Sequence, residues 1–335
     1  MLQCCAGDQR SLLSAAQAHS RLHQAAVLAL HSIRADVPQQ QQVDCVLGYL
    51  AKHGSQVHSL DLSSRQQVTL YQLPPILQLT SLQLRRFSLQ LQPACDSMGV
   101  LGAAATIAAL KHLQLQDCLV IDDDLGFTAA LQQLPTGLEH LSISGVHKPV
   151  SYGTCIEQLC QFAIPTQAVQ HLQRLTCLAL KGFGMDPAVL AGKTLLQHLQ
   201  LEDCWFDRAP RSAVSKLMAH LQPLQQLTSL NLHNSALDDE DSQISSPRYW
   251  TGEPRPGSAP VSAYEALTAS SKLQHLDLSL WKLPLGVWQH LFPAGRQLPH
   301  LTSPALTFVT GWLLPMVAQP LMVSSWSAAA QPCSI

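Results

Sequence analysis

The sequence predicts an α/β repeat solenoid, a curved parallel sheet with helices on its convex side and a helical cap at the N-terminus. Three observations support this. A short leucine phrase recurs along most of the 335 residues, polar residues alternate with leucine inside it, and helix-like segments separate the copies. Repetition of this kind is typical of solenoids, in which each copy packs only on its neighbours.

The recurring phrase is Leu-x-x-Leu-x-Leu, often continued by x-x-Cys/Phe-x-Leu. Its copies are Val57–Leu62, Leu79–Leu89, Leu110–Val120, Leu138–Ile143, Leu175–Met185, Leu196–Phe206, Leu227–Leu237 and Leu273–Leu283, with a ninth, degraded copy at Leu298 and Leu301. Successive copies start 21 to 46 residues apart. This scatter surrounds the spacing of about 20 to 29 residues that is typical of leucine-rich repeats.

Inside the phrase, one polar residue stands between two apolar residues, which is the alternation of a strand. The polar residues there include Asp61, Gln114, Gln200, Asn231 and Asp277. An all-helical repeat does not fit this pattern. A single strand cannot bury its leucine side, so we expect stacked copies to form a parallel sheet that packs on the return segments. The ninth position of two copies is a cysteine, Cys118 or Cys204, rather than an asparagine. This favours the intracellular subclass of the repeat and predicts that both thiols pack in the core.

The segments between copies predict helices at Thr128–Leu134, Thr154–Leu175 and Ser212–Leu227, because their apolar residues recur every three or four positions. A helix or helix pair over Asp8–Ile33 and a second helix over Gln41–His53 are expected in the cap. Lys52 and His53 followed by Gly54 predict the end of the second helix.

These elements divide the chain into three parts. Residues 1–56 are the expected cap, residues 57–310 the solenoid, and residues 311–335 an uncharged tail. Residues 238–271 interrupt the solenoid as a Pro-rich loop insertion that ends in a short helix, Ala263–Ala269. Tyr249 and Trp250 in this loop either anchor a partner or pack back on the solenoid.

The cap sequence Asp8-Gln-Arg-Ser-Leu-Leu-Ser-Ala-Ala-Gln-Ala-His-Ser-Arg-Leu-His-Gln-Ala-Ala26 resembles the second half of an F-box. The matching residues are Leu12, Leu13, Ala16, Arg21 and Leu22. The Leu-Pro opening and first helix of the F-box, which carry much of its adaptor-contacting surface, have no counterpart here. The repeats are similar to those of F-box leucine-rich-repeat proteins and of green-algal leucine-rich-repeat proteins. The F-box resemblance implies a substrate-recognition subunit of a cullin-type ubiquitin ligase.

Charge and cysteine usage exclude several other classes of protein. Charged residues make up 13%, the formal net charge is −2, and no Lys/Arg run exists, so we expect no nucleic-acid partner. No secretory signal is visible, which predicts free thiols for the 10 cysteines and a cytoplasmic location, with cytoskeleton, cilium or nucleus as alternatives. The apolar stretch Ala305–Val323 is interrupted by Pro315 and Pro320 and lacks basic flanks, so no membrane span is expected.

Catalysis and metal binding find no support in the sequence. There is no Gly-rich phosphate loop, nucleophile elbow or His-Glu-x-x-His motif, so we expect no enzyme and no cofactor. His112, His140, Cys177 and His198 are zinc-type ligands at equivalent positions of adjacent copies. They form a line rather than converging on a point, so we interpret them as a repeated polar position and expect no metal.

The sequence therefore predicts a monomeric protein-binding module that recognises a protein partner through the concave face of its sheet. The expected contact residues are Gln83, Arg85, His112, Gln114, Gln116, His140, Lys181, His198, Gln200, Glu202, Asn231, His233, His275 and Asp277. Their charges are mixed, so no partner of one strong sign is implied. The alternative is a structural scaffold on the cytoskeleton or cilium with no link to ubiquitin.

Overall fold

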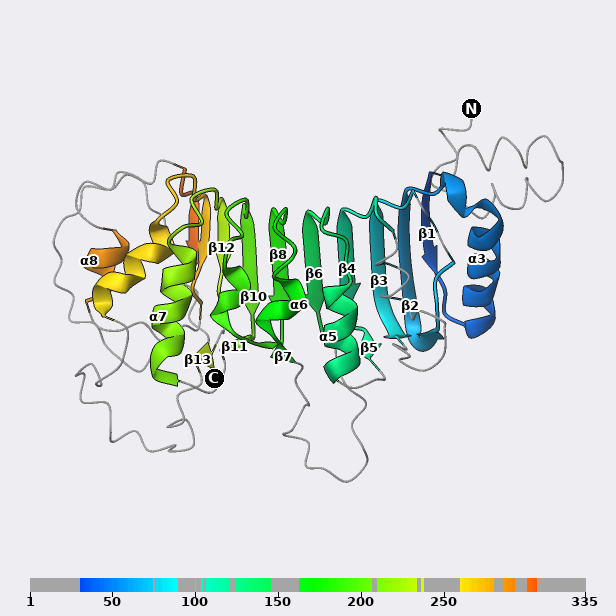
Figure 1. The fold of residues 1–335 in the computed structure, drawn as a ribbon, viewed down its shortest axis with the longest axis horizontal. Coiled ribbons are helices and arrows are strands. Elements are labelled where there is room, and N and C mark those ends of the chain that lie inside the picture. The colour runs from blue at the N-terminus through cyan, green and yellow to red at the C-terminus, as the bar shows by residue number, and fades with distance from the viewer. Residues whose placement is uncertain are drawn as a thin grey trace, which may run out of the picture.

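The computed structural model describes residues 31–74, 76, 78–89, 100, 104, 107–120, 124–145, 163–206, 210–233, 236–237, 260–279, 286–292 and 300–305. Ten of its strands follow one another in a single parallel sheet, in the order of the chain (Figure 1). They are β1 (Ser32–Asp36), β2 (Ser59–Leu70), β3 (Ser81–Leu89), β4 (His112–Gln116), β6 (His140–Ser144), β8 (Cys177–Lys181), β10 (His198–Glu202), β12 (Ser229–Asn231), β14 (His275–Asp277) and β15 (Ser303–Ala305). This order and pairing make the chain a leucine-rich-repeat solenoid.

A second set of two-residue strands follows the turns at the ends of the main strands. β5 (Leu119–Val120) pairs with β3, while β7 (Ala163–Ile164), β9 (Gly184–Met185), β11 (Trp205–Phe206) and β13 (Ala236–Leu237) form a small sheet of their own. A repeat of this kind therefore runs through a main strand, a turn and a short second strand before its return segment begins.

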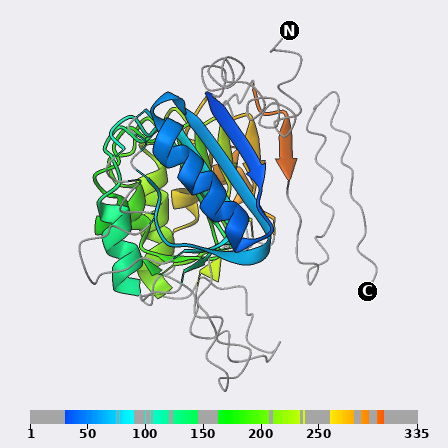
Figure 2. The ribbon, with the colours of Figure 1, turned by 90° about the vertical axis from the view of Figure 1, so that its right-hand side faces the viewer.

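The return segments hold the helices, which cover one side of the main sheet (Figure 2). The α-helices are α3 (Gln40–His53), α5 (Asp124–Gln132), α6 (Thr166–Val169), α7 (Pro210–Leu221) and α8 (Trp288–Leu291); the 3₁₀ helices are η2 (Gly54–Gln56), η3 (Pro187–Leu190) and η6 (Val261–Thr268). Helices predicted at 41–53, 128–134 and 212–227 correspond to α3, α5 and α7. Figure 1 shows α3 at the β1 end of the stack, where Val43 and Leu50 are buried.

The prediction of one long helix over Thr154–Leu175 was wrong in its described part. Residues 163–164 form β7, and α6 is a single turn that begins after Pro165. Proline lacks an amide hydrogen and pushes the residue before it into the extended region, so a helix cannot run through this position. Residues 154–162 lie outside the described part of the chain.

The main sheet begins earlier than predicted, inside the segment that we expected to be a helical cap. Ile33, the predicted end of a helix, belongs to β1, where it is opposite Leu60 of β2 and buried. Alternation of Ile33 and Ala35 with polar residues provides the strand pattern, but no Leu-x-x-Leu-x-Leu phrase announces it. The rest of the predicted helix Asp8–Ile33 and the F-box-like stretch lie outside the described residues.

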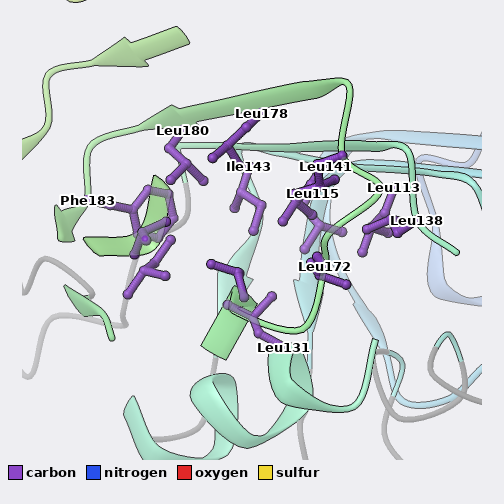
Figure 3. Close-up of a cluster of buried hydrophobic side chains, with 14 of the residues drawn as sticks. Leu113, Leu115, Leu131, Leu138, Leu141, Ile143, Leu172, Leu178, Leu180 and Phe183 are labelled. Atoms are coloured by element: carbon purple, nitrogen blue, oxygen red, sulfur yellow. The ribbon is translucent and has the colours of Figure 1, made fainter. Parts of the chain in front are cut away.

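Buried leucines from the strands and the return segments form one continuous core. One row runs across eight consecutive strands, each member at most 1% exposed: Leu60, Leu82, Leu113, Leu141, Leu178, Leu199, Leu230 and Leu276. Figure 3 shows strand residues such as Ile143 and Leu180 on the same side of the sheet as Leu131 and Leu172 of the return segments. Burial of each leucine side chain stabilises the folded chain by about 2 kcal/mol, before the conformational entropy lost on folding is subtracted.

A residue with positive φ follows the end of several main strands. These residues are Asp117 (52°), Gly145 (60°), Gly182 (78°) and Asp203 (50°), which come directly after β4, β6, β8 and β10; Arg86 (61°) has the same conformation inside β3. After Arg86, Asp117, Gly182 and Asp203, the next residue is at most 1% exposed and lies in the core: Phe87, Cys118, Phe183 and Cys204.

The residue after this turn confirms the packing role predicted for the cysteines of the ninth position. Cys118 and Cys204 are at most 1% exposed, and their Sγ atoms contact the carbonyl oxygens of Leu84 and Leu180 at 3.5 and 3.4 Å. Burial raises the thiol pKa to about 11 for Cys118 and about 12 for Cys204.

The C-terminal part confirms the ninth copy and the short helix of the insertion, and it shows that the predicted loop ends before residue 260. The degraded ninth copy provides β15, and the short helix of the insertion is η6, which buries Tyr264. Residues 260–271 are thus an ordered return segment rather than loop. Tyr249, Trp250 and the tail 311–335 lie outside the described residues. Within the described chain, no helix has the length and apolar character that crossing a membrane requires.

Candidate functional site

The face of the main sheet opposite the helices, which we call the open face, carries three rows of in-register side chains. The first row is Ser32, Ser59, Ser81, His112, His140, Cys177, His198, Ser229 and His275. The middle row includes Arg34, Asp61, Gln83, Gln114, Ser142, Ala179, Gln200, Asn231 and Asp277. The last row is Asp36, Ser63, Arg85, Gln116, Ser144, Lys181 and Glu202.

The structure brings thirteen of the fourteen predicted contact residues into these rows, which alternate with the buried leucines. His233 is the exception, because it follows β12 in a turn, where its carbonyl oxygen accepts from the Asp203 amide at 3.0 Å. Sequence reasoning missed the contribution of β1, Arg34 and Asp36, since its strand lacks the leucine phrase.

The first row places imidazoles side by side at the centre of the open face. The rings of His112 and His140 are 5.8 Å apart between centroids, and His140 Nε2 lies 3.9 Å from Cys177 Sγ. Burial lowers the pKa of His140, and the neighbouring His112 and His198 lower it further. Burial also raises the pKa of the Cys177 thiol. At neutral pH, His140 is therefore held neutral and Cys177 protonated.

No group of three or more metal-ligating side chains converges on a point in the described part of the chain. The strands hold the imidazoles and the thiol of the first row along a line across the sheet. A tetrahedral ion needs ligands that surround one point. The arrangement is thus suited to contacting an extended surface.

Glu202 organises the polar side chains of the later strands. Its Oε1 accepts hydrogen bonds from Gln200 Nε2 at 2.8 Å and Asn231 Nδ2 at 3.0 Å, and its Oε2 accepts one from Lys181 Nζ at 3.0 Å. Lys181 also lies 3.5 Å from Asp203, and the hydrogen bond to Glu202 is the main cause of its raised pKa. Exposed pairs of this kind add little stability, but the linked set fixes the orientation of four side chains.

The first strands carry a second charged group, centred on Asp61. Its carboxylate lies 3.0 Å from Arg34 and 4.0 Å from Arg85, while Arg85 also donates to Gln83 Oε1 at 3.4 Å. Arg85 Nε is shielded from solvent and has no hydrogen-bond partner in the described residues. Between the two charged groups, the middle row is uncharged from Gln83 to Gln200.

Comparison with known proteins gives distant likeness alone. No family model matches the chain, and no curated protein matches its sequence. Among solved structures, a leucine-rich-repeat protein of Leptospira interrogans is similar at 18% identity and a TM-score of 0.42, covering 76% of this chain. The chain spans 56% of that protein. An internalin of Listeria monocytogenes is similar at 15% identity and a TM-score of 0.30, over 84% of this chain and 88% of its own. The fold assignment rests on the strand order and register, to which these scores add nothing.

Proposed function

We propose that the chain is a protein-binding module that recognises its partner on the open face. The observation that carries the proposal is the set of three in-register polar rows on a sheet face that the helices leave uncovered. The ten strands of the sheet leave nine gaps of about 4.8 Å, so the face extends over about 43 Å. A face of this length accommodates a standard protein interface.

The rigidity of the face favours binding. From β2 to β14, buried leucine and isoleucine residues alternate with the polar residues of the three rows, and Glu202 already holds Lys181, Gln200 and Asn231 in place. Side chains that are ordered before a partner arrives lose little entropy on binding. The mixed polar and charged groups supply specificity more than affinity.

A photo-cross-linking experiment tests the proposal. The photoreactive amino acid benzoylphenylalanine replaces Gln200 on the open face or, as a matched control, Gln132 at the end of α5; both glutamines are exposed. After irradiation in cells, we expect a discrete protein adduct from position 200 and none of the same mass from position 132. Equal adducts from both positions, or adducts from position 132 alone, contradict the proposal.

A narrower version makes the chain the substrate-recognition subunit of a cullin-type ubiquitin ligase. Its support is the F-box resemblance of Asp8–Ala26, which lies outside the described residues. Purification of the full chain from cells is then expected to recover an adaptor and a cullin. Recovery of the open-face partner without either subunit refutes the ligase version and leaves the binding module intact. Retention of the chain in detergent-resistant cytoskeletal fractions would favour the scaffold alternative instead.

A further inference from the structure

The centre of the open face carries a patch of imidazoles on four adjacent strands. His112, His140 and His198 belong to this patch, and Cys177 stands between the last two. We call these four residues the imidazole patch. His112 and His198 are exposed, while His140 is half-buried between its neighbours, with the His112 ring 5.8 Å away. Imidazoles are the side chains whose charge changes between pH 5 and 8.

Within the first and middle rows of the open face, the side chains next to the imidazole patch are uncharged. Within the first row, Ser81 and Ser229 flank it. On the same face, the middle row beside it consists of Gln114, Ser142, Ala179 and Gln200. Lys181 and Glu202, which lie beyond that row on β8 and β10, are paired with each other at 3.0 Å. The middle row therefore separates the imidazoles from the charges of the last row.

On the other side of the patch, the residues just before the strands are basic on balance. Glu139 precedes His140 and lies 3.1 Å from Lys111 and 3.7 Å from Arg174. The hydrogen bond from Lys111 is the main cause of the lowered pKa of Glu139, so this carboxylate is already engaged. Lys111 and Arg174 against Glu139 leave one net positive charge, and three protonated imidazoles raise it to four.

We propose that the imidazole patch binds a carboxylate-rich, extended segment of a partner protein, and that this binding strengthens as the pH falls below neutrality. The inference rests on the proposed function, because it names the chemistry of the partner that the open face takes. Carboxylates supply the negative charges that the protonated patch lacks. Strand spacing of about 4.8 Å sets the imidazoles in a row that an extended chain can follow.

The sign of the pH dependence follows from linkage. A bound carboxylate stabilises the protonated imidazole, so the bound complex holds more protons than the free protein near pH 6 to 7, and affinity rises as pH falls. Desolvation and the two neighbouring imidazoles lower the pKa of free His140, so its protonation depends most on a bound anion. Each proton taken up changes affinity by at most about tenfold per pH unit.

A protein segment fits the patch better than a nucleic acid does. Single-stranded nucleic acids are held mainly by stacking of bases on aromatic side chains, together with a basic groove. The described residues of the three rows include no Phe, Tyr or Trp. A net charge of −2 for the whole chain also offers no general attraction for a phosphate backbone.

The test uses a fluorescein-labelled peptide of twelve residues that alternates Asp and Ser, with an Asn/Ser peptide as the uncharged probe. Fluorescence anisotropy with the full chain, at pH 7.5 and 5.5 in the presence of EDTA, is expected to give about a tenfold or larger rise in affinity for the Asp peptide alone. In the double variant His112→Gln/His198→Gln, we expect the rise to fall below about threefold. Both residues are exposed, and urea unfolding of the variant checks that its fold is retained.

The double variant His53→Gln/His220→Gln is the matched control, because it removes two imidazoles from α3 and α7. It is expected to keep the full pH response. An unchanged affinity between the two pH values, an equal loss in the control, or equally tight binding of labelled oligothymidine overturns the inference. The proposed function fails separately, when a cross-linker at position 200 yields no adduct. A partner that cross-links there with pH-independent affinity refutes the imidazole inference alone.

Discussion

Lys193 is expected to make the stability of the solenoid rise with pH above neutrality. Its side chain is 0% exposed, and its Nζ donates to the carbonyl oxygens of Val169 at 2.8 Å and Leu172 at 3.3 Å. Burial lowers the pKa of this ammonium from 10.5 to about 8. The hydrogen bonds to the two carbonyl oxygens partly stabilise the charged ammonium, but they do not replace the hydration shell that it loses on burial.

The magnitude follows from linkage. Because the pKa of Lys193 is about 8 in the folded chain and 10.5 in the unfolded chain, the unfolded chain binds more protons between these values. The free energy of unfolding therefore increases as pH rises through this window, and the gain is lost as pH falls through about 8. At pH 9.5, about 1.5 units above the folded pKa, the gain relative to pH 7 is about 2 kcal/mol.

The assay is urea unfolding at pH 7, 8.5 and 9.5 for the native chain and for Lys193→Met. Methionine keeps an unbranched side chain of similar length without the titrating group. Other groups that titrate in this range are common to both proteins and cancel in the difference. We expect the native chain to gain about 2 kcal/mol on the variant between pH 7 and pH 9.5. Parallel pH profiles for the two proteins would refute a buried ammonium at this position.

Three further predictions concern the core. Leu180→Ala is expected to lower the free energy of unfolding by about 2 to 5 kcal/mol, measured by urea unfolding, because Leu180 is 1% exposed and a cavity remains. Native labelling with iodoacetamide at pH 8, mapped by mass spectrometry, is expected to modify exposed Cys45 and to spare Cys118, whose thiol is buried with a pKa of about 11; rapid native labelling of Cys118 would contradict its packing role. Gly54→Ala is expected to cost about 1 kcal/mol in the same urea assay, because an added Cβ would lie 3.3 Å from Ile76 Cγ1, and an unchanged midpoint would show that Ile76 yields freely.

The glycine after α3 illustrates how a correct prediction can rest on a different cause. Lys52 and His53 followed by Gly54 predicted the end of a helix, and α3 does end at His53. Gly54, however, has a φ of −63°, which any residue adopts. What favours a glycine here is the close approach of Ile76, whose Cγ1 would lie 3.3 Å from an added Cβ, a contact from another repeat that local sequence does not reveal.

Strands were predictable from sequence because a period of two with leucine at the buried positions is written in each copy. The same logic assigned Gln114, Gln200 and Glu202 to one face, since alternation fixes sides once a strand is known. β1 was not predicted, because Ile33 and Ala35 stand where the other strands have leucines. The strand β7 and the short helix α6 were predicted as one helix, because the apolar residues there recur every three or four positions although Pro165 interrupts the helix.

Interactions between repeats lie beyond what one sequence gives. Row positions predicted that His112 and His140 are neighbours, but the burial that lowers the pKa of His140 depends on how the strands stack. The contacts of Glu202 with Lys181 and Asn231 join three strands and require the register to be known. Burial of Lys193 against the carbonyl oxygens of Val169 and Leu172 depends likewise on the preceding return segment.

The affinity of the partner captured at position 200 tests the central claim, binding through the open face, most directly. It would be measured by isothermal titration calorimetry for the native chain, for Gln114→Trp and for the control Gln132→Trp on α5. The account predicts that the open-face substitution weakens binding at least about tenfold, because a bulky indole replaces a half-buried amide at the centre of the face and keeps the partner from close contact. The control is expected to keep the native affinity. Equal affinities for all three proteins, or a loss confined to the control, would contradict the account.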